Sequence, residues 1–218
     1  MKNKNLIIVI ISLIFSIISG IITHDILIGS MLLFTSLICA YFASVGKKIT
    51  YIASFINCLL MGYVAFKNNL YGIFIFYTFI FSLLQLKGFI SWKENEDEDN
   101  NVKAREFTLK NGIIITLSCV IGSFLLGYIL TLIPGQKLAY MDATSNCINL
   151  CGVILGILRF KEAWWVWLFN NVIDLSIWII MVINHGSNSI MMLLSSLAYL
   201  IINIYGIIKW NKLVKKEK

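Results

Sequence analysis

One pattern occurs twice in this chain: Gln85-Leu-Lys-Gly88-Phe-Ile-Ser-Trp92 and Asn203-Ile-Tyr-Gly206-Ile-Ile-Lys-Trp210. In each copy, an amide side chain is followed by glycine three positions later and by tryptophan seven positions later. The copies lie 118 positions apart in a chain of 218 residues, and repetition at such a distance predicts an internal duplication. Duplicated membrane proteins usually place their binding site between the two halves.

The composition places the chain in a lipid bilayer. Hydrophobic residues make up 59% and charged residues 13% of the chain, and the mean hydropathy is +0.84. Soluble domains average about 25% charged residues. The apolar runs are long and lack the alternation expected of barrel strands. The sequence therefore predicts an all-α integral membrane protein.

Polar or charged breaks divide the chain into eight apolar segments. Each is close to the ~20 residues that a helix needs to cross a ~30 Å hydrocarbon core. The first segment follows two lysines, but no small-x-small cleavage site closes it, so we interpret it as a transmembrane helix and not as a signal peptide. The eight predicted transmembrane helices are 6–23, 26–44, 49–66, 70–91, 111–133, 139–158, 163–183 and 188–208.

Positive charge is distributed unevenly over the ends of these segments. If the N-terminus is cytoplasmic, fifteen of the 18 Lys and Arg residues fall on that side, Lys67 and Lys137 fall on the other, and Lys87 lies inside a segment. This asymmetry follows the positive-inside rule and predicts that both termini are cytoplasmic. Because no basic patch is interleaved with aromatic residues, the lipid bilayer and not a nucleic acid is the expected partner of the +7 net charge.

Both copies of the repeated pattern lie in segments that run toward the cytoplasm, so the halves are predicted to be parallel copies with a connector helix between them. The only sustained acidic run follows the fourth segment, which predicts a solvated linker. The predicted organisation is an additional N-terminal transmembrane helix (1–25), a first three-helix repeat (26–92), an acidic cytoplasmic linker (93–110), a connector transmembrane helix (111–137), a second three-helix repeat (138–210) and a basic cytoplasmic tail (211–218).

Several stretches resemble one family, the PnuC family of nicotinamide riboside transporters. Phe55-Ile-Asn57-Cys-Leu-Leu, Leu70-Tyr71 and the Gln85 to Trp92 pattern are similar to its first half. Four further stretches resemble the later signature of the family: Asp142-Ala-Thr-Ser145, Lys161-Glu162-Ala-Trp164-Trp165-Val-Trp167, Asn171-Val-Ile and the Gly206 to Trp210 stretch. The likeness covers nearly all of residues 26–210, and the order and spacing of the stretches make it specific.

The resemblance implies a facilitator with a three-plus-one-plus-three helical core, similar in architecture to SWEET sugar carriers. It also implies a homotrimer in a bacterial plasma (inner) membrane. The family is thought to carry vitamin precursors down their gradient, while a cytoplasmic kinase traps the product by phosphorylation.

Side chains inside the segments suit such a cargo. Nicotinamide riboside is a small monocation with an aromatic ring, a carboxamide and ribose hydroxyls, so its site needs a stacking face, amide partners and little positive charge. An unpartnered amide inside a membrane costs several kcal/mol, so such amides bind either a ligand or a neighbouring helix. The amides inside apolar segments are Asn57, Gln85, Asn146, Asn149, Asn170, Asn171 and Asn203.

Depth in the membrane separates the members of the repeated pattern. The amide, the glycine and the indole share one helical face, because they are spaced at i, i+3 and i+7. Trp92 and Trp210 lie at predicted cytoplasmic ends, where an interfacial belt is the expected role of an indole. Gln85 and Asn203 are therefore the predicted ligand-facing members.

Segment 163–183 carries a second stripe. Trp164, Trp167, Asn171, Asp174 and Trp178 follow one another at helical steps of three and four residues. Indoles, an amide and a carboxylate on one face are what the wall of a cation site would contain. Anchoring of the indoles at the membrane interface is the alternative.

Asp174 is the only acid deep inside a predicted transmembrane helix, which makes it a candidate functional residue. Three roles are open: balancing a cationic substrate, pairing with Lys87, or exchanging a proton. The corresponding position of the family is usually uncharged, and a thiamine-type cation is an alternative cargo that would suit this carboxylate equally well.

Other chemistries find little support in the sequence. The five cysteines lie in apolar segments without a histidine nearby, and no phosphate-binding glycine loop or nucleophile elbow occurs, so we expect no metal site, no cofactor and no catalysis. An intramembrane enzyme and a structural membrane subunit are the alternative classes. The predicted function is uptake of nicotinamide riboside by alternating access, with Asn57, Gln85, Trp164, Trp167, Asn171, Asp174 and Asn203 as the substrate-binding residues.

Overall fold

The computed structural model describes residues 2–98, 100–107, 109–186 and 188–216, and side chains from residue 5 onward except at 99, 108–111, 187 and 216–218. Within these residues the fold is helical, with two isolated backbone bridges and no strand. The elements are α1 (Lys2–Ile22), α2 (Ile28–Ser44), α3 (Thr50–Lys67), α4 (Tyr71–Ile75), the π-helix η1 (Phe76–Phe81), α5 (Ser82–Glu94), α6 (Leu109–Thr131), α7 (Ala139–Ile157), α8 (Ala163–Ile183) and α9 (Ser189–Lys216).

The helices follow the eight predicted segments closely. Elements α4, η1 and α5 continue without a break and form one helix from residue 71 to 94, so each predicted segment has one counterpart. The largest difference is in α9, which runs eight residues past the predicted end at 208. Val214 is only 5% exposed there, so the prediction of a separate tail is wrong for residues 211–216, while 217–218 lie outside the described part.

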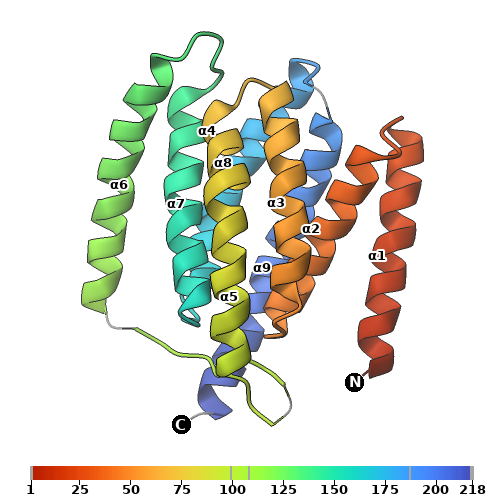
Figure 1. Cartoon of the computed structure of the whole chain (residues 1–218), viewed down its shortest axis with the longest axis vertical. Helices are drawn as coiled ribbons and strands as arrows, with labels where there is room; N and C mark the ends of the chain where they lie inside the picture. The colour runs from red at the N-terminus through yellow and green to blue at the C-terminus, as the bar shows by residue number, and fades with distance from the viewer. Residues whose placement is uncertain (1, 99, 108, 187, 217–218) are drawn as a thin grey trace.

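Six of the helices form a closed ring. Packing runs from α2 to α3, then to the α4–η1–α5 helix, α7, α8 and α9, and α9 packs back against α2. Two helices stand outside this ring, as Figure 1 shows at its left and right edges: α6 packs on α7, and α1 packs on α2. The ring, and not the outer pair, therefore surrounds the interior of the bundle.

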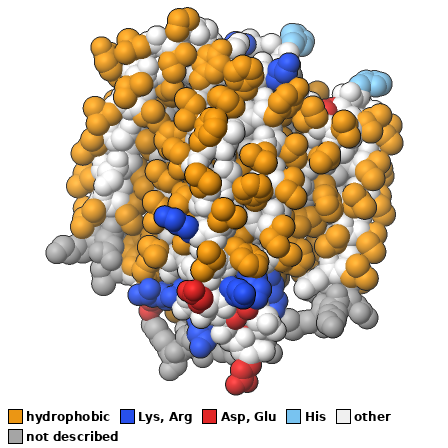
Figure 2. Space-filling model, viewed as in Figure 1, with side chains coloured by type: hydrophobic (Ala, Val, Ile, Leu, Met, Phe, Trp, Pro, Cys, Tyr) orange, Lys and Arg blue, Asp and Glu red, His pale blue; other side chains and the backbone are white. Residues whose placement is uncertain are grey.

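The outer surface is suited to lipid. Large apolar side chains cover the flank of the molecule in Figure 2. Six helices are long and apolar enough to cross a membrane, and α2 is apolar but shorter. Helix α7 has 19 residues but is less apolar, because it carries Asp142, Asn146 and Asn149. Length and composition alone thus support six of the eight predicted transmembrane helices.

Charged side chains collect at one end of the bundle. Figure 1 shows both chain termini at this end, and Figure 2 shows most of the Lys, Arg, Asp and Glu side chains there. The side chains of Lys2, Lys4, Lys110, Lys216 and Lys218, which belong to the predicted cytoplasmic set, lie outside the described residues. We call this the charged end and the opposite one the far end.

Most side chains of the segment after α5 are at least partly exposed, but the segment also packs on the bundle. It folds across the charged end, where Val102 and Ala104 are 2% and 6% exposed, whereas Glu98 and Lys103 are exposed. One of its acids, Glu96, pairs with Lys48 at 2.7 Å. Acidic composition shows which side chains are hydrated but does not show where the backbone finds hydrogen-bond partners.

Candidate functional site

The ring encloses a cavity of about 170 Å³. This volume is more than ten times the roughly 15 Å³ that one buried water needs. All six ring helices contribute to its wall, and all seven predicted substrate-binding residues line it. The lining residues used below are Tyr51, Asn57, Tyr77, Gln85, Trp92, Asn149, Trp164, Trp167, Asn170, Asn171, Asp174, Tyr199 and Asn203.

Helix α8 supplies the most polar wall. Trp164, Trp167, Asn171 and Asp174 all line the cavity, as their shared stripe predicted. Trp178, the last member of that stripe, instead lies in an apolar cluster with Leu32, Met61, Val64 and Met181. The stripe therefore leaves the cavity one turn after Asp174.

Glycines on neighbouring helices let two of the cavity indoles, those of Trp164 and Trp167, pack closely. A Cβ at Gly152 or Gly156 of α7 would lie 2.4 Å or 2.8 Å from the Trp167 ring, and one at Gly206 of α9 would lie 2.2 Å from Trp164. The indoles of Trp164 and Trp167 meet edge to face, with ring centroids 5.2 Å apart and an interplanar angle of 82°. Both rings are thus fixed in orientation before any ligand arrives.

Asp174 has no cationic partner among the described residues. The Ser145 hydroxyl donates to its Oδ1 at 2.5 Å and the Asn170 amide donates to its Oδ2 at 2.8 Å. Of the residues that the structure describes, no Lys, Arg or His lines the cavity. Lys87 is exposed on α5, so the proposed pairing of Asp174 with Lys87 is wrong. Helical period places Lys87 two residues beyond Gln85, on the outer face.

The amides differ in how far they are committed to helix packing. Asn57 donates to the Leu32 carbonyl and to the hydroxyls of Thr35 and Ser36, which fastens α3 to α2. Gln85 donates to the Phe81 carbonyl of its own helix at 3.0 Å. Asn57 therefore serves largely to hold α3 against α2, although it also lines the cavity.

Three polar atoms on cavity-lining residues lack a hydrogen-bond partner within the described structure. They are the indole nitrogen of Trp164 and the amide oxygens of Asn170 and Asn171. Buried polar atoms are nearly always hydrogen-bonded, so each unpaired one needs an explanation. One donor and two acceptors around a cavity are the complement of a ligand that carries a carboxamide or hydroxyls.

Trp92 and Trp210 do not form the interfacial belt that their depth predicted. They are 2% and 1% exposed, and their rings lie 5.5 Å apart. The Trp92 indole N–H donates to the Gly156 carbonyl at 2.9 Å, and the Trp210 indole N–H donates to the Ala43 carbonyl at 3.1 Å. The prediction is wrong because each indole turns inward to a carbonyl near the end of α7 or α2 instead of outward to lipid head groups.

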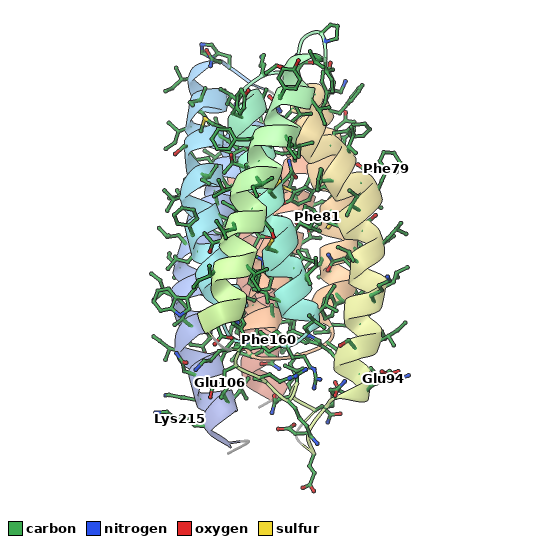
Figure 3. The ribbon with its side chains drawn as sticks, turned by 90° about the vertical axis from the view of Figure 1, so that its left-hand side faces the viewer. Phe79, Phe81, Glu94, Glu106, Phe160 and Lys215 are labelled. Atoms are coloured by element: carbon green, nitrogen blue, oxygen red, sulfur yellow. The ribbon has the colours of Figure 1, made fainter. Side chains whose placement is uncertain are left out.

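Several cavity residues were missed by sequence reasoning. Tyr51, Tyr77 and Tyr199 line the cavity, and Asn149 donates to the Tyr77 hydroxyl at 2.9 Å. For Tyr77 and Tyr199 the available signal was a tyrosine well inside an apolar segment, since membrane tyrosines are commonest at the interfaces. Tyr51 lies at the start of its segment and had no such signal. The π-helix η1, which Figure 3 shows with Phe81 inside the bundle and Phe79 outside, had no signal of this kind.

The chain matches a known family over most of its length. The family model described as "Nicotinamide mononucleotide transporter" matches residues 26–212. The chain belongs to this family. The expectation of a membrane transporter that is not an enzyme is thereby confirmed, and so is the resemblance to PnuC proteins, as the following relatives show.

Individual members of the nicotinamide mononucleotide transporter family are similar over nearly the whole chain. The nicotinamide riboside transporter PnuC of Neisseria mucosa is 28% identical over 196 residues, which cover 87% of this chain and 74% of the relative. The protein of the same name from Haemophilus influenzae is 26% identical over 185 residues, covering 84% and 78%. A crystal structure of the vitamin B3 transporter PnuC superimposes with a TM-score of 0.85 at 25% identity, covering 98% of this chain and 93% of that one.

Proposed function

We propose that this protein facilitates the uptake of nicotinamide riboside by alternating access. The observation that carries this proposal is that the carboxyl group of Asp174 faces a cavity lined by indoles, and that the described residues around this cavity include no basic side chain to act as its counter-ion. Burying a charge without a counter-ion is costly, so a cationic ligand is favoured. Relatives of the chain bear the name nicotinamide riboside transporter, and this cargo is such a cation.

The proposed binding mode uses all seven residues predicted from the sequence. The pyridinium ring stacks on Trp164 and Trp167, and Asp174 balances its charge. The unpaired indole N–H of Trp164 and the amide oxygen of Asn171 are available to the carboxamide. Gln85, Asn203 and Asn57 face the same cavity from the other helices and serve the ribose hydroxyls.

The two halves of the ring are proposed to be parallel three-helix repeats, with α6 as their connector and α1 as an additional helix. Contacts at a constant spacing support this. Tyr51 packs over Gly88, and Trp164, 113 positions after Tyr51, packs over Gly206. The reciprocal bonds of Trp92 and Trp210 follow the same relation, since their acceptors Ala43 and Gly156 are also 113 positions apart.

The charged end is proposed to face the cytoplasm of a bacterium, with all eight helices crossing the inner membrane. The excess of Lys and Arg at this end supports the orientation. We further propose a homotrimer and metabolic trapping of the cargo by a cytoplasmic kinase, as the family resemblance implies. Under this scheme the gradient alone drives flux, and phosphorylation prevents the cargo from returning.

A thiamine-type cation is the second candidate cargo. Asp174 favours it, because a carboxylate facing a cavity balances any aromatic cation and does not select pyridinium over thiazolium. The unpaired donor and acceptors near Trp164 and Asn171 favour the carboxamide of nicotinamide riboside instead.

Proteoliposomes that contain the purified protein test the function. Labelled nicotinamide riboside should equilibrate across the membrane without ATP or an ion gradient, and excess thiamine should not compete. Accumulation above equilibrium in response to a proton gradient would contradict facilitation and would assign Asp174 to proton exchange. Uptake of thiamine but not of nicotinamide riboside would identify a thiamine-type cation as the cargo. Absence of saturable uptake of both compounds would favour a structural subunit.

A further inference from the structure

Residues 95–98 and 100–106, which we call the strap, cross the charged end of the ring and connect two equivalent loops. The amide of Val102 donates to the carbonyl of Gly46, in the loop between α2 and α3, at 2.8 Å. The amide of Arg105 donates to the carbonyl of Arg159, in the loop between α7 and α8, also at 2.8 Å. Gly46 and Arg159 lie 113 positions apart, which is the spacing of the other paired contacts.

Ion pairs repeat the same arrangement. Glu96 of the strap pairs with Lys48 at 2.7 Å, and Glu106 pairs with Lys161 at 2.8 Å. Lys48 and Lys161 are again 113 positions apart. Figure 3 shows Glu106 and Phe160 close to each other at this end of the bundle. The strap thus holds one loop of each half with a backbone hydrogen bond and an ion pair.

Between the strap and the cavity lies a layer of aromatic rings. Val102 and Ala104 of the strap belong to one buried apolar cluster with Tyr51, Trp92, Trp164, Trp210 and Val214. Three of these rings, those of Tyr51, Trp92 and Trp164, also line the cavity. A solute that leaves the cavity at this end must therefore separate the rings and displace the strap that covers them.

We propose that the strap is a latch on the cytoplasmic mouth, and that it must detach from the Gly46 loop before the cargo can leave the cavity. This inference rests on the proposed alternating access. When the two halves move apart at this end, a segment bound to both must release one of them. Besides its ion pair, the first half holds the strap by the Val102 bond and by an exposed bond from the Lys47 ammonium to the Asn100 carbonyl at 3.0 Å. The second half holds it more firmly, by two backbone hydrogen bonds, Arg105 to Arg159 and Lys161 to Arg105, and by the Arg105 guanidinium over the Phe160 ring.

The ion pairs have the strength expected of a reversible latch. The side chains of Lys48 and Glu96 are 32% and 14% exposed, and those of Lys161 and Glu106 are 27% and 37% exposed. Partly solvated pairs of this kind contribute little stability and are screened by salt. They therefore bias the mouth toward closure without preventing its opening.

Labelling of native cysteines tests the latch independently of transport. Cys39 and Cys58 line the cavity, so their reaction with a water-soluble thiol reagent in detergent reports its opening. Glu96→Gln should speed this labelling by about two- to fivefold, as loss of one partly exposed ion pair allows. Glu98→Gln, an exposed acid of the same segment, is the matched control and should leave the rate unchanged. Equal rates for the two variants overturn the proposal.

Two cross-links distinguish the side on which the strap releases. Gly46 has a φ of +72°, so a side chain there costs some strain, but its Cβ would lie 3.3 Å from the Val102 side chain, and Gly46→Cys with Val102→Cys places two thiols within reach of each other. Arg105 and Phe160 are partners in a parallel bridge, where opposed Cα atoms lie ~4.8 Å apart, so Arg105→Cys with Phe160→Cys also suits a disulfide.

Oxidation of the Gly46–Val102 pair should slow the flux of nicotinamide riboside by at least about tenfold, and a reductant should restore it. Oxidation of the Arg105–Phe160 pair should leave the flux unchanged, because this side stays attached. Unchanged flux in the oxidised Gly46–Val102 protein overturns the latch. Absence of flux in both reduced proteins and in the wild type contradicts the proposed cargo, while the cysteine labelling still decides the latch.

Discussion

The two halves of the ring, residues 28–94 and 139–216, share a frame of contacts and differ in what they present to the cavity. Each half has an aromatic ring over a glycine, an indole that donates to the other half, and a loop held by the strap. The charge is not shared. Position 174 is aspartate, whereas the position 113 residues earlier is Met61.

The same difference recurs two turns away. Trp167 corresponds at this spacing to Ser54, and both line the cavity. The halves thus share the close ring–glycine contacts and the attachment of a loop to the strap. Only the second half contributes a carboxylate and an indole at the position of Trp167. Because the helix contacts are repeated in both halves, the two halves can move apart in a symmetric way. Because the cavity-lining side chains differ, the binding site itself is asymmetric.

Removal of the unshared charge should have the largest effect. Asp174→Asn should weaken nicotinamide riboside by about ten- to a hundredfold, because a hydrogen-bonded charge contributes roughly 1.5–3 kcal/mol. The uncharged dihydro form of the same ligand should lose much less. Calorimetric titration of both ligands measures the ratio.

Asp142→Asn serves as the control for this effect. Asp142 is fully buried and accepts hydrogen bonds from the Gly72 amide, Gln136 and Asn146 at 2.7–3.0 Å, away from the cavity lining. Its replacement should lower thermal stability and leave the ratio of the two affinities unchanged. A similar loss for cation and neutral ligand in Asp174→Asn would mean that the carboxylate is structural.

The shared glycines should respond alike in stability. A Cβ at Gly88 would lie 2.0 Å from the Tyr51 ring, and one at Gly206 would lie 2.2 Å from the Trp164 ring. Gly88→Ala and Gly206→Ala should each cost about 1–3 kcal/mol of unfolding free energy, since a rigid ring must move. Thermal unfolding in detergent measures this cost.

Gly112→Ala is the matched control, because its Cβ would meet only a contact of 3.4 Å, from Phe107. It should leave stability unchanged or raise it, since alanine is the better helix former. A large cost for only one of the two ring glycines would break the proposed equivalence of the halves.

The exchanged indole bonds should be worth less. Trp92→Phe and Trp210→Phe each remove a donor from a buried carbonyl and keep most of the ring, so each should cost about 1 kcal/mol. Because the two bonds are related by the repeat, the costs should agree to within roughly 0.5 kcal/mol. Because the two rings lie 5.5 Å apart, the costs should not simply add in the double variant. Chemical unfolding of the three variants tests both expectations, and additive costs would show that the two bonds act independently.

The smallest effect concerns a charge at the charged end. Burial raises the pKa of Glu162 above its ordinary value, so the folded state favours the neutral carboxyl. Glu162→Gln should therefore stabilise the protein by a few tenths of a kcal/mol at pH 8, because this group is partly solvated. The gain should vanish as the pH falls through the raised pKa and the wild-type carboxyl becomes neutral.

Ile49, which is 42% exposed and 113 positions earlier, provides the comparison for this pH dependence. Ile49→Gln should change the melting temperature by the same amount at pH 5 and at pH 8. A gain in Glu162→Gln that persists at low pH would assign the effect to packing and not to ionisation.

Much of the fold could be predicted because it follows from local properties. The lengths of the apolar segments predicted where the helices lie. The spacing of glycine and tryptophan in the repeated pattern indicated matched positions in the two halves. The seven predicted cavity residues were found because polar side chains inside apolar segments are few, and those with helical spacing, such as Trp164 to Asp174, fall on one face.

The errors concern partners that sequence does not specify. Trp92 lies at the depth of an interfacial anchor, but a carbonyl on another helix determines where its indole points. Lys87 lies inside a predicted segment, but the rotation of its helix was unknown, and its side chain faces outward. The contacts of the strap were missed because acidic residues dominate it, while its structure depends on the carbonyls of distant loops.

The strap also bears on how such a ring can be assembled. Two separate three-helix chains could form the ring and the two indole hydrogen bonds between the halves, because these contacts involve only residues of the two halves and none of the strap. Neither chain alone would carry a segment that reaches from Gly46 to Arg159. Joining the halves into one polypeptide therefore added a part that has no duplicate, and a single sequence of about a dozen residues became able to set the opening rate of one face independently of the other.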